Sequence, residues 1–191
     1  DPWILIARAF APCYIGGWSA CEHWNLTEQI FRDVVVITSK PVRPRHGGIG
    51  DVRYLARVVA PDQLFGTRRV WRDQTPVDVS DPSRTIVDIL DVPALGGGIR
   101  HVADVVRAYF ASEHRNDRRL VEYARRLGNQ TVFKRLGFLI QRLGIDAPDL
   151  LGECRAARSA GYARLDPSGP ARGRLLRRWG LQVNVEVPPG P

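Results

Sequence analysis

Four consecutive β-branched residues, Val34 to Ile37, constrain the fold of this chain more than any other feature. A continuous apolar run of this kind is typical of a strand that is covered on both faces, whereas a half-exposed strand alternates. The run therefore predicts a buried strand, which we place over residues 31–37. A second strand is predicted over residues 52–59. The segments on either side of the Asp73-Gln74-Thr75-Pro76 turn predict a hairpin.

The middle of the chain has the periodicity of helices. Asp81-Pro82 combines an N-cap residue with a first-turn proline, as Asp1-Pro2 does for a helix at the start of the chain. Asn116 and Gly128 are predicted to begin and end another helix. The strongest apolar periodicity follows, at Val132, Phe133, Leu136, Leu139, Ile140 and Leu143.

The end of the chain predicts one more strand. Residues 181–187 alternate apolar and polar side chains, which is the pattern of a half-buried strand, and we expect it to return to the first sheet. The predicted fold class is mixed α/β: a mixed sheet flanked by helices, with a helical middle section and a closing strand. One domain is expected over residues 1–191, with an α/β part (1–80), a helical part (81–158) and a closing turn and strand (159–191).

Composition narrows the class of protein. Apolar residues make up 44% of the 191 residues, which is enough for a core, and no apolar run approaches the roughly 20 residues that span a bilayer. The three cysteines lack metal or disulfide spacing, and the first residues resemble no secretory leader, so a cytoplasmic location is predicted. Methionine is absent, which favours a natural protein with a further N-terminal domain.

No pattern of catalytic residues stands out. A nuclease of the two-carboxylate-plus-lysine type needs a lysine beside its acids, but the only lysines, Lys40 and Lys134, form no such triplet. The four histidines share no ligand spacing, and no Gly-x-Ser-x-Gly is present. Gly96-Gly97-Gly98 before a helix could bind an anion, although a helix connector is the better interpretation. We therefore expect no enzyme, no metal and no cofactor.

The chain is strongly basic, with a formal net charge of +8 and nearly all of the positive charge on arginine. Arginine neutralises phosphates and binds bases, which indicates nucleic acid or an acidic partner. Codon bias in a GC-rich genome also explains the preference for arginine over lysine.

The candidate nucleic-acid or acidic-partner patch has its centre in the densest basic run. It comprises Arg172, Arg174, Arg177, Arg178 and Trp179, together with Arg43 and Arg45 of a Pro/Gly loop at 41–50. Trp179 would stack on a base in this hypothesis. The alternative is a solvated turn whose tryptophan packs on the core.

Several short motifs, taken in order, resemble the AbiEi family of antitoxins from type IV toxin–antitoxin systems, which take part in abortive infection and phage defence. The resemblance covers residues 1 to about 187. The motifs are Tyr14-Ile15-Gly16-Gly17-Trp18-Ser19-Ala20, Leu26-Thr27-Glu28-Gln29, Asp81-Pro82-Ser83-Arg84-Thr85-Ile86-Val87-Asp88, Tyr123-Ala124-Arg125-Arg126-Leu127-Gly128-Asn129, Lys134-Arg135-Leu136-Gly137-Phe138-Leu139, Leu165-Asp166-Pro167-Ser168-Gly169-Pro170 and Trp179 to Asn184.

The resemblance implies a C-terminal antitoxin domain that opposes a nucleotidyltransferase toxin, directly or indirectly. In this family an N-terminal winged helix-turn-helix binds DNA and represses transcription of the operon, and we expect this chain to correspond to the C-terminal domain alone. The alternative function is a basic nucleic-acid-binding domain that assists this repression. We interpret the motif residues as structural: Gly17, Ser19, Asp81, Pro82, Arg84, Gly128, Asn129, Gly137, Asp166, Pro167 and Gly169.

Overall fold

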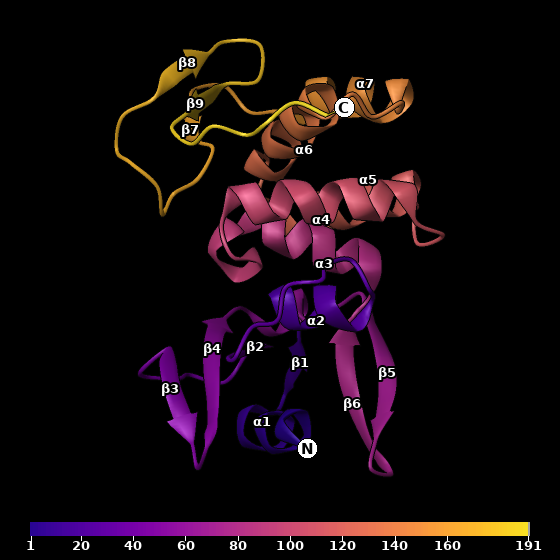
Figure 1. Cartoon of the computed structure of the whole chain (residues 1–191), viewed down its shortest axis with the longest axis vertical. Helices are drawn as coiled ribbons and strands as arrows, with labels where there is room; N and C mark the ends of the chain where they lie inside the picture. The colour runs from indigo at the N-terminus through magenta and orange to yellow at the C-terminus, as the bar shows by residue number, and fades with distance from the viewer. Residues whose placement is uncertain (191) are drawn as a thin grey trace. The chain divides into compact units, whose positions relative to one another are not determined.

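The computed structural model describes residues 1–190 and divides into two compact units, Asp1–Thr85 (unit 1) and Ile86–Pro191 (unit 2). Helix α3 (Pro82–Asp91) contains the boundary between them. Unit 1 holds a six-stranded mixed sheet, and unit 2 holds helices and a three-stranded sheet (Figure 1). The mixed α/β fold class is thus confirmed.

Unit 1 has the strand order β3-β4-β2-β1-β6-β5. The pairs β2–β4 and β1–β6 are parallel, whereas β1–β2, β3–β4 and β5–β6 are antiparallel. Its elements are α1 (Pro2–Phe10), β1 (Cys13–Ile15), α2 (Gly17–His23), β2 (Val34–Thr38), β3 (His46–Ile49), β4 (Val52–Val58), the 3-10 turn η1 (Pro61–Gln63), β5 (Thr67–Arg72) and β6 (Thr75–Ser80).

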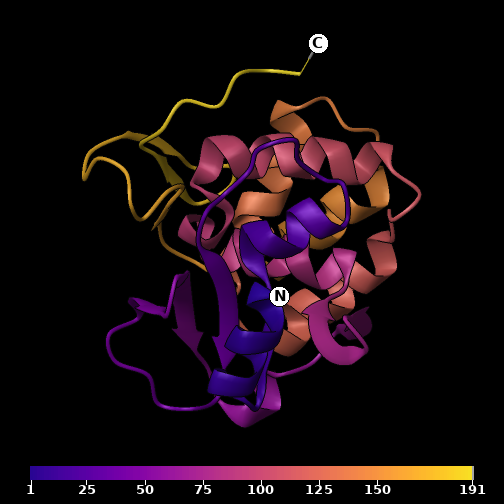
Figure 2. The ribbon, with the colours of Figure 1, turned by 60° about the horizontal axis from the view of Figure 1, so that its bottom comes forward.

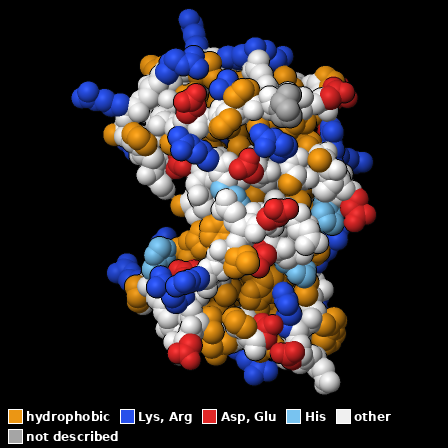
Figure 3. Space-filling model, in the orientation of Figure 1, with side chains coloured by type: hydrophobic (Ala, Val, Ile, Leu, Met, Phe, Trp, Pro, Cys, Tyr) orange, Lys and Arg blue, Asp and Glu red, His pale blue; other side chains and the backbone are white. Residues whose placement is uncertain are grey.

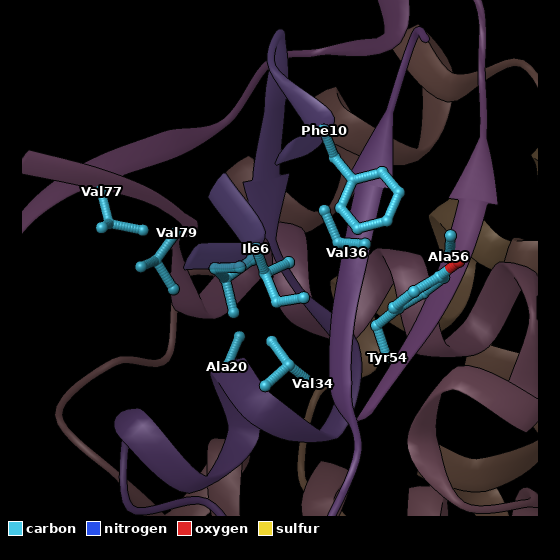
Figure 4. Close-up of a cluster of buried hydrophobic side chains, with 10 residues drawn as sticks. Ile6, Phe10, Ala20, Val34, Val36, Tyr54, Ala56, Val77 and Val79 are labelled. Carbon is cyan, nitrogen blue, oxygen red and sulfur yellow. The ribbon is translucent and has the colours of Figure 1, made fainter. Parts of the chain in front are cut away.

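Strand β2 lies at the centre of the sheet, and all five of its residues are buried, as the β-branched run predicts. Val34 and Val36 pack in one cluster with Ile6 and Phe10 of α1 (Figure 4). The other buried members of this cluster are Ile15, Ala20, Tyr54, Ala56, Val77 and Val79.

Part of the loop predicted at residues 41–50 is a strand. His46–Ile49 forms β3, which pairs antiparallel with β4 at the edge of the sheet. Its second residue, Gly47, lies so close to Tyr54 that an added Cβ would be 2.7 Å from the phenol oxygen. A glycine pair at an edge carries no apolar alternation, so the sequence pattern did not reveal this strand.

Unit 2 is mainly helical. It begins within α3. Its other elements are η2 (Pro93–Gly96), α4 (Ile99–Ala111), α5 (Asp117–Leu127), α6 (Thr131–Arg142), α7 (Pro148–Ala157), β7 (Ala163–Arg164), β8 (Arg174–Leu176) and β9 (Leu181–Val183). The predicted limits of α5 are confirmed. The Asn116 side chain accepts a hydrogen bond from the Arg119 amide, and Gly128 ends the helix with φ at 81°.

The expectation that the last strand returns to the first sheet is wrong. Strand β9 pairs parallel with β7 and antiparallel with β8 in a separate sheet, which lies to one side of the unit 2 helices (Figures 1 and 2). The strand is also shorter than predicted. The side chain of Asn184 bonds both the amide and the carbonyl of Asp166, which replaces strand pairing just after Val183.

In residues 1–190, no helix has both the length and the apolar character that crossing a membrane requires.

Candidate nucleic-acid interface

The motif residues of unit 1 complete the edge of β1. Strand β1 ends where α2 begins, so the Val35 amide of β2 has no strand carbonyl opposite it. The hydroxyl of Ser19 accepts this hydrogen bond at 3.0 Å, while the Gly16 amide donates to the Val35 carbonyl. Gly17 starts the helix with φ at 52°. Ser19 and Gly17 are therefore structural.

Replacing Ser19 with alanine is expected to lower the free energy of unfolding of unit 1 by about 1–3 kcal/mol, because the buried Val35 amide loses its acceptor. Urea denaturation followed by tryptophan fluorescence reports this, since Trp3, Trp18, Trp24 and Trp71 all lie in unit 1. Ser19→Thr keeps the hydroxyl and is the control. An alanine variant as stable as the wild type would contradict the role assigned to Ser19.

Asp81, Pro82 and Arg84 begin α3. The Asp81 carboxylate accepts the Arg84 amide at 2.9 Å, and Pro82 occupies the first turn. The Arg84 side chain is 1% exposed, with its guanidinium 3.9 Å from the centre of the Phe65 ring. This arginine therefore contributes to the interior of unit 1 and is not open to a phosphate.

A half-buried histidine lies among tryptophans in unit 1. The His23 ring contacts Trp3 and Trp24 edge to face, and the Arg72 guanidinium lies 4.3 Å from the centre of the Trp3 ring. Burial, and secondarily the charge of Arg72, lower the pKa of His23 from its usual 6.5. Neutral imidazole is the form that suits these surroundings.

Because the unfolded chain binds this proton more readily, the His23 contribution to the stability of unit 1 is present above pH 6.5 and is lost as the pH falls below it. We expect the urea midpoint of the tryptophan fluorescence transition to decrease from pH 7.5 to about pH 5.5. His23→Gln should flatten this dependence relative to the wild type. An unchanged slope in that variant would remove His23 as its cause.

Two of the three cysteines, Cys13 and Cys154, are unsuited to nucleophilic chemistry. Burial, with a smaller contribution from Asp78, raises the pKa of Cys13 to about 11. Burial, with a smaller contribution from Glu153, raises that of Cys154 to about 12. Both therefore remain thiols at neutral pH. Within residues 1–190, no group of three or more His, Cys, Asp and Glu residues is arranged to hold a metal ion.

In unit 2, the helix start that follows the three glycines is occupied by a carboxylate of the chain itself, that of Asp166. The Asp166 carboxylate accepts the Ile99 amide at 2.8 Å and the Ser168 amide at 2.9 Å. It thus caps α4 and shapes the turn that contains Pro167. Gly169 lies in the same turn, where an added Cβ would be 2.7 Å from the Val185 side chain. The triple glycine is a connector whose helix start is already occupied.

Asn129 joins two helices of unit 2, and Gly128 ends a third. The Asn129 amide donates to the Asp91 carboxylate at 2.6 Å, and its oxygen accepts the Thr131 amide. This contact ties the end of α3 to the start of α6, directly after Gly128 closes α5.

Two buried cations on α6 were missed by the site prediction. The Arg135 guanidinium donates to four carbonyl oxygens, those of Leu90, Asp91, Arg164 and Leu165, at 2.8–3.0 Å. The Lys134 ammonium donates to the Gly161 carbonyl at 2.9 Å. Desolvation lowers the pKa of both side chains. Since the same helix carries a third cation, Arg142, which is exposed, the sequence offers no signal that separates the buried pair from a solvated face.

Trp179 does not belong to the exposed patch. Its side chain is fully buried, and its indole nitrogen donates to the Gln141 side chain at 2.8 Å. Gly137 of α6 provides the space, because a Cβ there would collide with the indole ring. The structure therefore has the alternative arrangement, in which the tryptophan packs on the core.

The four arginines of the predicted run are exposed and belong to a larger set, which we call the arginine surface. Residues 155–185 contain seven arginines and a single acidic residue, the buried Asp166. The members are Arg155, Arg158, Arg164, Arg172, Arg174, Arg177 and Arg178. Lys and Arg side chains project around the small sheet at the top of the view in Figure 3.

The arginine surface carries the net charge of unit 2. Unit 1 has eleven Lys and Arg against nine Asp and Glu, whereas unit 2 has seventeen against eleven. In the part of the chain that the structure describes, none of the seven arginines forms an ion pair with a carboxylate. They are therefore available to an external anion.

Arg43 and Arg45 are exposed but lie in unit 1, on the segment before β3. The predicted patch thus combines residues of two units.

Two hollows of unit 2 differ in charge. A groove of about 580 Å³ between α5 and α7 has an apolar floor of Val121 and Leu150, and its walls contain four carboxylates and two arginines. A smaller one, of about 310 Å³, is lined by two arginines, Arg142 and Arg174, and one carboxylate, Glu186. Of these two, the first has an excess of carboxylates and the second an excess of arginines.

No known family profile matches the chain, and no curated protein sequence matches it. A solved structure does: the crystal structure of the RV2827C protein from Mycobacterium tuberculosis. It superposes with a TM-score of 0.64 at 16% identity, over 95% of this chain and 67% of that one. The fold of this chain therefore occurs in that mycobacterial protein.

Proposed function

We propose that this chain is an antitoxin domain of the AbiEi type that opposes a nucleotidyltransferase toxin by binding rather than by catalysis. The observation that carries the proposal is the ordered set of family-like motifs over residues 1 to about 187. The structure adds support, since these motifs complete strand edges, cap helices and fill the core in both units. If two chains share a fold, the residues that maintain the fold are the ones expected to be alike in both.

The test is growth rescue. We expect the 191-residue chain, co-expressed with the nucleotidyltransferase toxin encoded beside its gene, to restore growth. A destabilised variant such as Gly137→Ala should protect less in proportion to its loss of folded protein. If a folded, soluble chain leaves growth blocked, the antitoxin proposal for this chain is wrong.

A second candidate function is binding of nucleic acid through the arginine surface. Seven arginines without a carboxylate partner support it, because each one that meets a phosphate releases a counterion. Binding should weaken as salt rises from about 50 to about 200 mM, and changing Arg172, Arg174, Arg177 and Arg178 to glutamine should flatten this dependence. Unaltered binding by the fourfold variant would assign it to another surface.

A further inference from the structure

We propose that the outward face of the β7–β9–β8 sheet binds single-stranded nucleic acid, with Tyr162 as the base-stacking residue. This inference rests on the second candidate function, and it adds the class of ligand and the place where it binds. It does not depend on antitoxin activity.

Strand register defines the outward face. Arg164 of β7 pairs with Gln182 of β9, which pairs with Leu175 of β8, so the three side chains form one row across the sheet. The neighbouring row, Ala163, Leu181 and Leu176, faces inward, and Leu181 is fully buried. Arg164 and Leu175 are exposed, and Leu175 is 57% exposed.

Tyr162 belongs to the same face. Exposure alternates along the segment, since residues 162 and 164 are exposed, Ala163 is half-buried and Leu165 is buried. This alternation is that of an extended chain whose even-numbered side chains point outward. Tyr162 is 51% exposed, and it precedes Arg164 by two residues. The face thus combines an aromatic ring, a guanidinium, an amide and an exposed leucine.

Three further exposed arginines flank the ends of β8, whereas Arg174 alternates with Leu175 and points to the opposite side of the sheet. Arg172 precedes β8, and Arg177 and Arg178 follow it in the turn to β9. Single strands are bound by this combination of a basic path for the backbone and an aromatic platform for the bases. The Gln182 side chain can both donate to and accept from a base edge.

Charge favours a duplex, whereas base stacking favours a single strand. The exposed aromatic residue therefore determines which class of nucleic acid we expect. A duplex has the higher charge density, so a purely electrostatic surface binds it at least as tightly as a single strand. Paired bases are not available to an aromatic side chain, whereas unpaired bases stack on it. Among nucleic acids, an exposed tyrosine beside Arg164 therefore favours the single strand.

The experiment is fluorescence anisotropy with the whole chain. The probes are a fluorescein-labelled single strand of about 20 nucleotides and the duplex of the same sequence, at several salt concentrations. We expect the single strand to bind about tenfold more tightly. Tyr162→Ala should weaken single-strand binding by about 5- to 150-fold and leave duplex binding unchanged, whereas Tyr162→Phe should retain it.

Arginine variants locate the backbone path. Arg164→Gln should reduce the salt slope for the single strand by about 0.7. Arg118→Gln is the matched control, because Arg118 is an exposed arginine of unit 2 that lies on α5, beside the acidic groove. Circular dichroism of each variant establishes that it is folded.

Each of the following outcomes would contradict one part of the proposal. Duplex binding that equals or exceeds single-strand binding, or a folded Tyr162→Ala variant that binds normally, refutes the stacking site and leaves the second candidate function standing. Absence of binding to either probe at low salt refutes both. Loss of affinity in Arg118→Gln equal to that in Arg164→Gln refutes the location.

Discussion

Replacing Gly137 with alanine is expected to lower the free energy of unfolding of unit 2 by about 2 kcal/mol, although alanine favours a helix. The added methyl group would overlap the indole ring of Trp179, which is fully buried. The ring is held by the hydrogen bond from its nitrogen to Gln141, so the overlap forces either α6 or the turn before β9 to shift.

Gly152 of α7 is the matched control. It is also a helical glycine of unit 2, but an added Cβ there meets nothing within 4 Å, so alanine should stabilise unit 2 by up to about 1 kcal/mol. Far-UV circular dichroism during urea denaturation measures both effects, because unit 2 contains most of the helix. A Gly137→Ala variant as stable as Gly152→Ala would show that the indole does not need this space.

Arg135→Lys should cost unit 2 about 3 kcal/mol, although the charge is retained. The planar guanidinium donates in several directions at once to carbonyls from two segments, at the end of α3 and at the end of β7. The compact ammonium group of lysine cannot reach all four carbonyl oxygens. The oxygens that lose their hydrogen bond are partly or fully buried.

The control for Arg135→Lys is Arg118→Lys, at an exposed position of the same unit, where we expect a change within about 0.5 kcal/mol. The circular dichroism transition is again the measurement. Equal midpoints for the two variants would mean that the four hydrogen bonds of Arg135 contribute little to stability.

The elements that could be predicted from the sequence are those whose causes are local. Asn116 and Gly128 limit α5 because a side-chain cap and a left-handed glycine act within one turn. Strand β2 was predicted because its β-branched run records burial on both faces. Partners of short strands are not local in this sense. The alternation at 181–187 indicates a strand, but nothing in it distinguishes β7 and β8 from the first sheet.

In the candidate surface, too, the features with local causes could be predicted and those with long-range causes could not. The exposure of Arg172, Arg174, Arg177 and Arg178 follows from their density in one short segment, and it was predicted. The burial of Trp179 depends on Gly137, which lies 42 residues earlier in the chain. Arg43 and Arg45 have the composition of the patch but lie in unit 1. Arg135 is hidden by carbonyls of two other segments, and no pattern on its own helix records them.

The cap of α4 has a consequence for synthesis. The Ile99 amide and the Asp166 carboxylate are separated by 67 residues, and a ribosome that adds about 5–20 residues per second needs roughly 3–13 s to travel between them. During that interval the nascent helix start lacks its acceptor, and the Arg164 and Leu165 carbonyls that bind Arg135 are also still to be made. Unit 1 has by then been synthesised completely. The capped start of α4 and the hydrogen bonds of Arg135 to β7 can therefore form only after residues 164–166 have been synthesised, late in the synthesis of unit 2.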